Sequence, residues 1–324
     1  MTLMLDIDKL TLEFETPAGL VHALDRVDLS VQRGECVALV GESGSGKSIT
    51  GMSILRLNGP NARIRANRIA LDGTDMQKMP DKVFQTIRGR RVAMIFQNAK
   101  SALNPLRRVG ETLTDILCTH SPERLSRRQG RARVLEMLNQ IGIHEAADRM
   151  QAYPAELSGG MCQRIMIVAA LLCDPELIIA DEPTSALDVT TQIRVMDLLM
   201  SACRQRGVAV LFITHDLALA SAYCDRAVVM HAGQVLEDGP ADRVFVHPRH
   251  PYSRMLLDSM PYGKDNAAEL KPMGGSLPDL RRDDLPACRF ADRCPRVQRC
   301  CRDGAIPEAR SDRAHVARCF FPHD

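Results

Sequence analysis

One short stretch near the N-terminus has the residue types and spacing of a phosphate-binding loop. Residues 41–48 read GESGSGKS, in which two glycines frame four residues and a lysine and a serine follow. Glycines let successive backbone N–H groups converge on an anion, and the positive end of a following helix adds to the attraction. The alternative is a Gly/Ser turn with an accidental lysine, but the apolar strand before the loop and the apolar helix after it favour a phosphate site.

The residue types in this loop indicate what each member does. We expect the ammonium of Lys47 to contact the β- and γ-phosphates of ATP, and the hydroxyl of Ser48 to ligate Mg²⁺. The rest of the predicted phosphate-binding set contributes mainly backbone N–H groups and comprises Gly41, Ser43, Gly44, Ser45, Gly46 and Ile49.

A pair of acids much later in the chain could complete the same site. Asp181 is the last residue of the run LIIAD, an expected apolar strand, and Glu182 follows directly. Asp181 is placed to hold Mg²⁺, usually through water, and Glu182 to polarise the attacking water. Alone, two such acids are more typical of a solvated strand end. Together with the phosphate loop they predict the second half of an ATP-hydrolysing site.

A group of thiols near the C-terminus could carry a second chemistry. Five of the eleven cysteines lie between residues 288 and 319. The first residues carry charges where a signal peptide needs an apolar run, and no apolar stretch approaches the roughly eighteen residues of a membrane span. We therefore expect a cytoplasmic chain, in which a cysteine cluster is more often a metal site than a disulfide framework.

Length and charge limit the classes of protein to consider. The 324 residues suffice for one large domain and a smaller one. Lysine and arginine number 42 against 40 acidic residues, so the net charge of +2 gives no indication of nucleic-acid binding.

The elements that must position these residues alternate between strands and helices. Helices are expected over 160–173 and 189–206. Strands are expected in LTLEF (10–14), ECVALV (35–40), IRANRIALDGTDM (64–76, a strand followed by an Asp72-Gly73 turn), RVAMIF (91–96), PELIIADEP (175–183) and VAVLFITHD (208–216). The alternation is typical of a mainly parallel sheet whose chemistry lies at the carboxyl ends of its strands. Arg-rich, helically spaced residues from about 98 to 153 predict a helical insertion, and 262–286 is interpreted as a linker.

Between the two halves of the site, LSGGMCQR (157–164) resembles the signature motif of ATP-binding cassette (ABC) ATPases. Gln97, SALD (185–188) and His215 are similar to that family's Q-loop, D-loop and switch histidine, so that six motifs occur in the family's order. The resemblance implies an α/β fold with a RecA-like, mostly parallel core, an antiparallel β part and a helical subdomain at about 98–160. It also implies a cassette domain over 1–245 and a small Cys-rich C-terminal domain over 246–324.

The resemblance also implies roles for residues outside the phosphate loop. Two cassettes meet head to tail, and Ser158, Gly159 and Gly160 at a helix N-terminus bind the γ-phosphate held by the partner. The implied catalytic residues are Gln97, which orients Mg²⁺ or water, Glu182 and His215. Phe14 is the candidate for stacking on adenine, with Val21 and His22 in the neighbouring turn, and Asp188 belongs to the nucleotide-binding set. The chain departs from its relatives at Asn98-Ala99 and at Cys162, which leaves ATP hydrolysis plausible.

Further segments narrow the resemblance to the ATPase subunits of bacterial oligopeptide, dipeptide and nickel ABC importers. These segments are SALNPLRRVG (101–110), HPRHPY (247–252) and the Cys-rich end. The resemblance implies an ATP-hydrolysing subunit at the cytoplasmic face of the membrane that powers uptake of dipeptides, including D-amino-acid dipeptides, or oligopeptides. Its implied partners are a second, different ATPase subunit, two membrane-spanning permeases and, indirectly, a substrate-binding protein, with no nucleic acid.

Several alternatives stay open at this point. The cargo could be nickel, because an ATPase subunit does not contact what is transported. A nucleic-acid-associated ABC ATPase or an exporter subunit fits less well, because the chain has one compact cassette without coiled coils or fused membrane spans. In HPRHPY, His247 and His250 could form a metal pair, but two prolines in an expected loop favour a structural docking role.

The thiol spacing bears on which metal the C-terminal region could hold. Cys288, Cys294, Cys301 and Cys319 are separated by five, six and seventeen residues, similar to relatives that hold a [4Fe–4S] cluster. Zinc is the alternative, although the short C-x₂-C spacing of zinc modules is missing, and a third possibility is no metal. Cys300 could replace Cys301. Positive charge around the thiols, which would stabilise thiolates, is expected from Arg289, Arg293, Arg296, Arg299 and Arg302.

Overall fold

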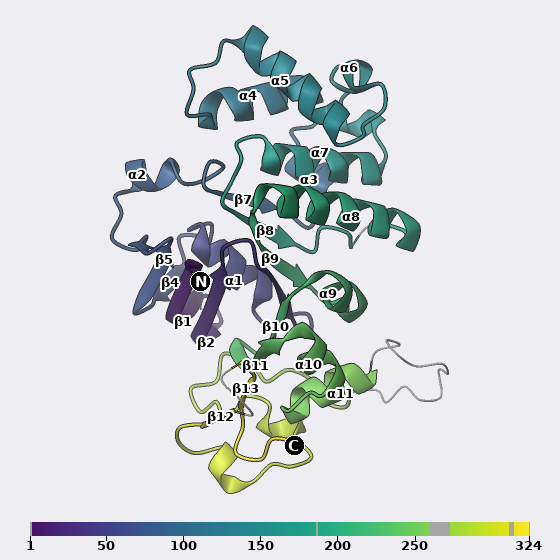
Figure 1. Ribbon diagram of the computed structural model, residues 1–324. Coiled ribbons are helices and arrows are strands. Elements are labelled where there is room, and N and C mark those ends of the chain that lie inside the picture. Colours follow the sequence, from purple (N-terminus) through teal and green to yellow (C-terminus); the bar gives the residue numbers. More distant parts are fainter. Residues whose placement is uncertain (1, 186, 260–272, 311–313, 324) are drawn as a thin grey trace. The chain divides into compact units, whose positions relative to one another are not determined.

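The computed structural model describes residues 2–185, 187–259, 273–310 and 314–323. The chain divides into two compact units, one built from Met1–Gln77 and Leu211–Asp324 and the other from Lys78–Val210. Figure 1 labels the elements of both units.

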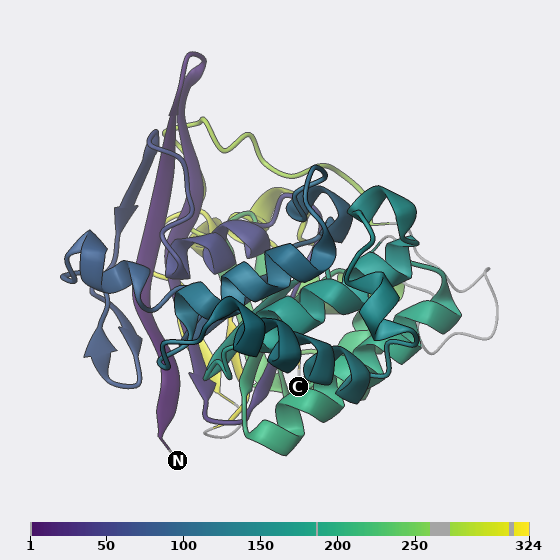
Figure 2. The same ribbon diagram turned by 90° about the horizontal axis from the view of Figure 1, so that it is seen from above.

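An antiparallel sheet near the N-terminus belongs to the first unit. β1 (Leu3–Thr16) and β2 (Gly19–Gln32) form a long hairpin, drawn as the purple strands of Figure 2. β1 also pairs with β4 (Ala62–Arg65) and β5 (Arg68–Leu71), and β5 pairs with β6 (Thr74–Asp75). The sequence predicted one strand across β4 and β5. That prediction is wrong, because the strand is interrupted at residues 66–67, between β4 and β5. The predicted turn at 72–73 is confirmed by positive φ angles at both residues.

A second sheet in the first unit positions the phosphate loop. Its strand order is β12, β13, β11, β10, β3 and β9. β3 and β10 run parallel, and β10, β11, β13 and β12 pair antiparallel in that sequence. The bounds are β3 Cys36–Val40, β9 Ala209–Thr214, β10 Arg226–His231, β11 Gln234–Pro240, β12 Glu308–Arg310 and β13 Val316–Arg318. β3 and β9 are buried along their whole length, as expected for strands covered on both faces.

Four helices of the first unit accompany these strands: α1 (Lys47–Ile54), α9 (Leu217–Tyr223), α10 (Ala241–Val246) and α11 (Pro251–Ser259). The cysteine-rich region follows α11 and contains two 3₁₀ turns, Ala291–Arg293 and Arg299–Cys301. Because β13 pairs with β11, this region is part of the first unit, and a separate Cys-rich domain is not supported. The boundary at 245/246 stays a prediction, and residues 262–272 of the predicted linker lie outside the described residues.

The second unit contains the parallel pair β7 (Val92–Ile95) and β8 (Leu177–Asp181) and most of the helices. The predicted helical insertion is confirmed by α3 (Ala99–Ala102), α4 (Val109–His120), α5 (Arg127–Gln140) and α6 (Ala146–Arg149). A short helix α2 (Asp81–Gln85), the signature helix α7 (Gly159–Leu171) and α8 (Val189–Arg206) complete the unit. In the described part of the chain, no helix is long and apolar enough to cross a membrane.

Candidate functional site

The predicted phosphate loop joins buried β3 to α1. Gly41 has φ 150°, and a Cβ atom there would lie 2.1 Å from the backbone oxygen of Met230. Gly46 is the N-cap of α1 with φ 101°, where a Cβ atom would lie 2.7 Å from Leu24. Both positions need glycine, which lets the loop fold tightly at the start of the helix.

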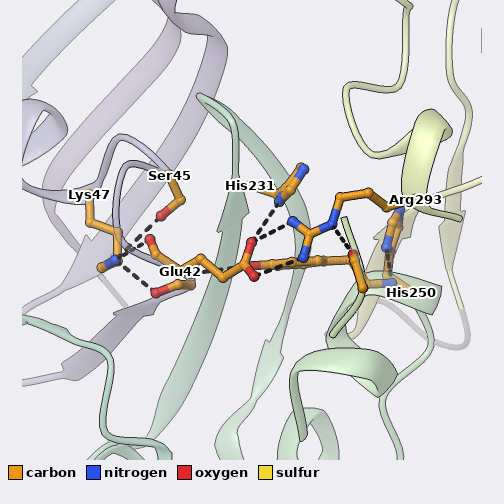
Figure 3. Close-up of polar contacts among 9 residues, drawn as sticks. Glu42, Ser45, Lys47, His231, His250 and Arg293 are labelled. Carbon is orange, nitrogen blue, oxygen red and sulfur yellow. Dashed lines mark hydrogen bonds and ion pairs between the residues drawn. The ribbon is translucent and has the colours of Figure 1, made fainter. Parts of the chain in front are cut away.

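Lys47 is buried inside this loop and is bound by loop oxygens. Its ammonium donates to the backbone oxygens of Gly41 and Glu42, each 2.8 Å away, and to the hydroxyl of Ser45 at 3.4 Å (Figure 3). Because a buried ammonium must keep partners, the side chain has a defined position. Phosphate oxygens could take the place of these acceptors.

Glu42 is held from the C-terminal region, which the sequence did not predict. Its carboxylate accepts two hydrogen bonds from Arg293, at 2.7 and 2.9 Å (Figure 3), and its N–H donates to the hydroxyl of Tyr252 at 3.0 Å. The guanidinium of Arg293 holds the pKa of Glu42 below its usual value near 4.5, although partial burial opposes the shift. No local pattern could have revealed these contacts, because the partners lie 251 and 210 residues away in the chain.

Two further predicted residues, Phe14 and His215, lie in the same unit as the loop. Phe14 is half-buried on β1, opposite Val21 of β2 and Ala62 of β4. His215 is exposed and directly follows β9, and Asp216 after it caps α9 with its carboxylate. Adenine stacking by Phe14 and a γ-phosphate contact by His215 stay predictions.

The predicted acids lie in the second unit, at the end of β8. Asp181 is buried as the last strand residue. Glu182 follows it with φ 45°, a conformation that side-chain-bearing residues rarely adopt and that is often found at functional sites. Gln97, two residues after β7, donates a hydrogen bond from its amide nitrogen to the Glu182 carboxylate at 2.7 Å. The structure thus brings together two of the three predicted catalytic residues.

The signature motif opens α7. Ser158 is the N-cap and accepts a hydrogen bond from the N–H of Met161 at 3.2 Å. Ser158 and Gly159 are exposed and Gly160 is half-buried, so the start of the helix is accessible. Cys162, one of the departures from the family pattern, is buried and its burial raises the pKa of the thiol. It therefore belongs to the core rather than to the exposed helix start.

The remaining predicted positions serve as helix caps. Asp188 caps α8 by accepting from the N–H of Thr191 at 3.0 Å. Hydrogen bonds from the side chain and the N–H of Thr191 lower the pKa of its carboxyl group. Asn98 caps α3 by accepting from the N–H of Ser101 at 3.1 Å. Residue 186 of the D-loop lies outside the described residues. A nucleotide contact by Asp188 stays a prediction.

The structure therefore holds the predicted nucleotide residues as two groups, one in each unit. The first unit contains the phosphate loop, Phe14 and His215. The second unit contains Gln97, Asp181, Glu182, Asp188 and the signature residues Ser158, Gly159 and Gly160. The first group has the chemistry to bind phosphates, and the second has a base and a buried acid of the kind that Mg²⁺ prefers.

The four cysteines predicted from their spacing line one small cavity in the first unit. Cys288 and Cys301 are buried, Cys294 and Cys319 are half-buried, and Cys300 is absent from the lining. Burial raises the pKa of Cys288 to about 12 and also raises the pKa values of Cys294 and Cys319. Among the described residues, no three thiol, imidazole or carboxylate groups are gathered closely enough to hold a single metal ion.

The expected ring of arginines around these thiols needs a correction. Of the five, Arg296 lines the cavity. The others bind elsewhere: Arg289 donates to the backbone oxygens of His22 and Ala232, Arg293 to Glu42, Arg302 to Asp292, and Arg299 pairs with Asp303. All five arginines are positively charged, but four of them form hydrogen bonds or ion pairs with groups other than the thiols.

The HPRHPY segment favours the structural interpretation. His247 is exposed after α10, whereas His250 is fully buried, and burial lowers its pKa to about 4. The Nδ1 atom of His250 accepts from the N–H of Tyr252 at 3.0 Å, at the start of α11. Tyr252 is itself completely buried.

Known proteins resemble this chain over its whole length. A family described as "ABC transporter" matches residues 24–185, and one described as "Oligopeptide/dipeptide transporter, C-terminal region" matches residues 236–301. A probable D,D-dipeptide transport ATP-binding protein of Escherichia coli (strain K12) is 44% identical, over 98% of this chain and 97% of its own length. An oligopeptide transport ATP-binding protein of Bacillus subtilis (strain 168) is 40% identical, over 99% of this chain and 97% of its own length.

Solved structures show the same cassette fold. The dimer of an ATP-binding cassette in a post-hydrolysis state, bound to ADP and Pi, has a TM-score of 0.66 and is 29% identical. The matched region spans 74% of this chain and 99% of the chain in that structure.

Proposed function

The chain belongs to the ABC transporter family as an ATP-hydrolysing subunit, and from this premise we propose that it powers the import of dipeptides or oligopeptides. The peptide class is supported by relatives that carry dipeptide and oligopeptide transport in their names and resemble nearly the whole chain. The match of the C-terminal region to a peptide-transporter family supports the same class.

The hydrogen bond between Gln97 and Glu182 is the observation that carries the proposed hydrolytic mechanism. Lys47 binds the β- and γ-phosphates, and the carboxylate of Glu182 accepts the proton of the attacking water. Gln97 holds that carboxylate in orientation, and His215 donates a hydrogen bond to the γ-phosphate. Mg²⁺, when bound, offsets the phosphate charge, and its proposed ligands are the oxygens of Ser48, Gln97 and Asp181.

Two cassettes are proposed to complete each site. The exposed N-terminus of α7, at Ser158 and Gly159, offers N–H groups and a positive helix end to an anion. The resemblance to a cassette dimer supports a γ-phosphate on a partner cassette as that anion. We propose a different ATPase subunit as the partner, with two permeases recruiting the pair to the cytoplasmic face of the membrane.

Reconstitution tests the peptide-import proposal. The chain is combined in proteoliposomes with its permeases and second ATPase, and uptake of labelled dipeptide, oligopeptide and Ni²⁺ is measured with ATP supplied on the cassette side. Peptide uptake that disappears when Lys47 is replaced by alanine is the expected result. Uptake of Ni²⁺ without peptide would assign the chain to nickel import instead.

We further propose that Cys288, Cys294, Cys301 and Cys319 hold a [4Fe–4S] cluster. The placement of all four thiols on one cavity, beside Arg296, supports the donor set. Each thiolate of such a cluster binds its own iron, so the four sulfurs need not converge on one point. Tetrahedral zinc on the same four thiolates is the alternative.

Metal analysis of anaerobically purified protein tests this cluster. We expect iron and acid-labile sulfide at about four each per chain, with absorbance near 400 nm that fades on reduction. Cys301→Ser should lose the iron, whereas Cys300→Ser should keep it. Stoichiometric zinc without iron would contradict the cluster and leave only the four-thiolate site.

A further inference from the structure

Glu42 connects the phosphate loop to the C-terminal region through three different groups. Its backbone oxygen accepts from Lys47 at 2.8 Å, its N–H donates to Tyr252, and its carboxylate accepts two hydrogen bonds from Arg293 (Figure 3). One residue of the loop therefore binds the phosphate-contacting lysine on one side and the C-terminal region on the other.

The groups that hold Glu42 are themselves fixed. The side chain of Arg293 is 5% exposed, and its Nε donates to the backbone oxygen of Gly274 at 2.9 Å. Tyr252 is fully buried and packs against His231 and Phe290, with ring centroids 4.5 and 5.2 Å apart. A bidentate pair between a buried guanidinium and a carboxylate favours one geometry, so it can hold the loop in one orientation.

A second part of the C-terminal region also lies on the loop. A Cβ atom built at Gly44 would come within 3.0 Å of Leu277 Cδ1, so this side chain packs directly on the turn of the loop. The N–H of His22, one strand away, donates to the backbone oxygen of Leu280 at 2.8 Å. Residues 277 and 280, in the described part of the predicted linker, thus attach this segment beside the loop at two points.

We propose that Arg293 and Tyr252 are positioning residues for ATP, which they orient through Glu42, so that the C-terminal region completes the nucleotide site. The peptide groups of Gly41 and Glu42 are those that Lys47 binds. Rotation of Glu42 would therefore move both the lysine and the loop N–H groups away from the phosphates. This role rests on ATP binding by the cassette and is independent of which cargo is transported.

Nucleotide titration of the full chain, purified without chelator, tests the proposal. Binding of Mg²⁺ and N-methylanthraniloyl-ATP is measured for wild type, Arg293→Gln, Glu42→Gln and the double variant. Each single variant should bind about tenfold more weakly, because the lost bonds are charge-assisted and fix the loop. The double variant should match the single ones, since both remove the same interaction. Arg293→Lys, which keeps the charge but not the bidentate pair, should fall in between.

Arg281→Gln is the matched control, because Arg281 makes an exposed bidentate pair with Asp279 in the same region. It should bind nucleotide within about twofold of wild type. Melting temperatures without nucleotide are measured in parallel. Lower melting temperatures in Arg293→Gln and Glu42→Gln with an unchanged dissociation constant would show a purely structural ion pair and overturn the proposal. If Arg293→Gln does not fold, Glu42→Gln decides the question, because it removes the ion pair without truncating the buried guanidinium side chain.

Discussion

At the scale of single residues, the position of Glu182 matches the needs of a catalytic base. Its strained φ of 45° and the 2.7 Å hydrogen bond from Gln97 hold the carboxylate in one orientation. The residue follows a buried acid at a strand end, which is where chemistry gathers in a parallel sheet.

Glu182→Gln is predicted to keep ATP binding and to lower the hydrolysis rate by about 100-fold or more, because the amide cannot take a proton from water. The variant should also trap a cassette dimer with ATP bound, visible by size-exclusion chromatography. Steady-state ATPase assays of the assembled transporter provide the measurement. A rate within about twofold of wild type would rule out the base role.

Glu42 gives a prediction for pH dependence. Its pKa is depressed in the folded protein, chiefly by the bond to Arg293, so the ion pair stabilises the fold above the usual value near 4.5. That stabilisation is lost as the pH falls below 4.5 and through the lower folded pKa. Melting temperatures between pH 6 and pH 3 should therefore fall more steeply for wild type than for Glu42→Gln. Parallel curves for the two proteins would contradict the shift.

Residue-level chemistry could be predicted where it follows local patterns. The phosphate loop, the strand-end acids and the signature serine are all visible as short runs with known spacing. The contacts of Arg293 and Tyr252 with Glu42 could not be predicted in this way, because they join distant parts of the chain. The same limit explains why arginines near the thiols in sequence were expected to face them, although Arg289 and Arg293 turn to backbone and carboxylate oxygens.

At the scale of elements, the start of α7 combines a structural and a functional task. Ser158 caps the helix, and the same exposed turn is the proposed γ-phosphate contact. The start of α5 offers a matched comparison, because Ser126 caps that helix through the N–H of Gln129 at 3.3 Å.

Ser158→Ala and Ser126→Ala are each predicted to lower the free energy of unfolding by about 1 kcal/mol through loss of the cap. Ser158→Ala should in addition lower the ATPase rate of the assembled transporter by about tenfold, because a γ-phosphate contact is lost. Urea denaturation and ATPase assays measure the two effects. Equal ATPase rates for the two variants would remove Ser158 from the nucleotide site.

Long, strongly patterned elements were predictable and short ones were not. The helix expected over 189–206 has those bounds, and β3 and β8 lie where apolar runs end at the loop and the acids. The three-residue strands β12 and β13 are too short for an alternating pattern to stand out, and β13 pairs with β11 far upstream. The sequence alone therefore predicts a separate Cys-rich domain, which the pairing of β13 with β11 does not support.

At the scale of the whole molecule, each cassette has the parts of an ATP site but not the partner that closes it. We predict that the isolated chain hydrolyses ATP slowly and that the rate rises at least about tenfold when the second ATPase and the permeases are present. Phosphate release is measured for the chain alone, for the mixed cassettes and for the full assembly. Full activity of the chain alone would contradict the requirement for a partner.

The first compact unit is assembled from both ends of the chain, Met1–Gln77 and Leu211–Asp324, whereas the second is continuous. A ribosome therefore releases all of the second unit before the first can be complete. At about 5–20 residues per second, roughly 10 to 50 s pass between synthesis of Lys47 and synthesis of Arg293. The phosphate loop is synthesised early, but Arg293, which binds Glu42 of the loop, is synthesised near the end. A chain that ends before Arg293 should accordingly have a phosphate loop without the ion pair at Glu42.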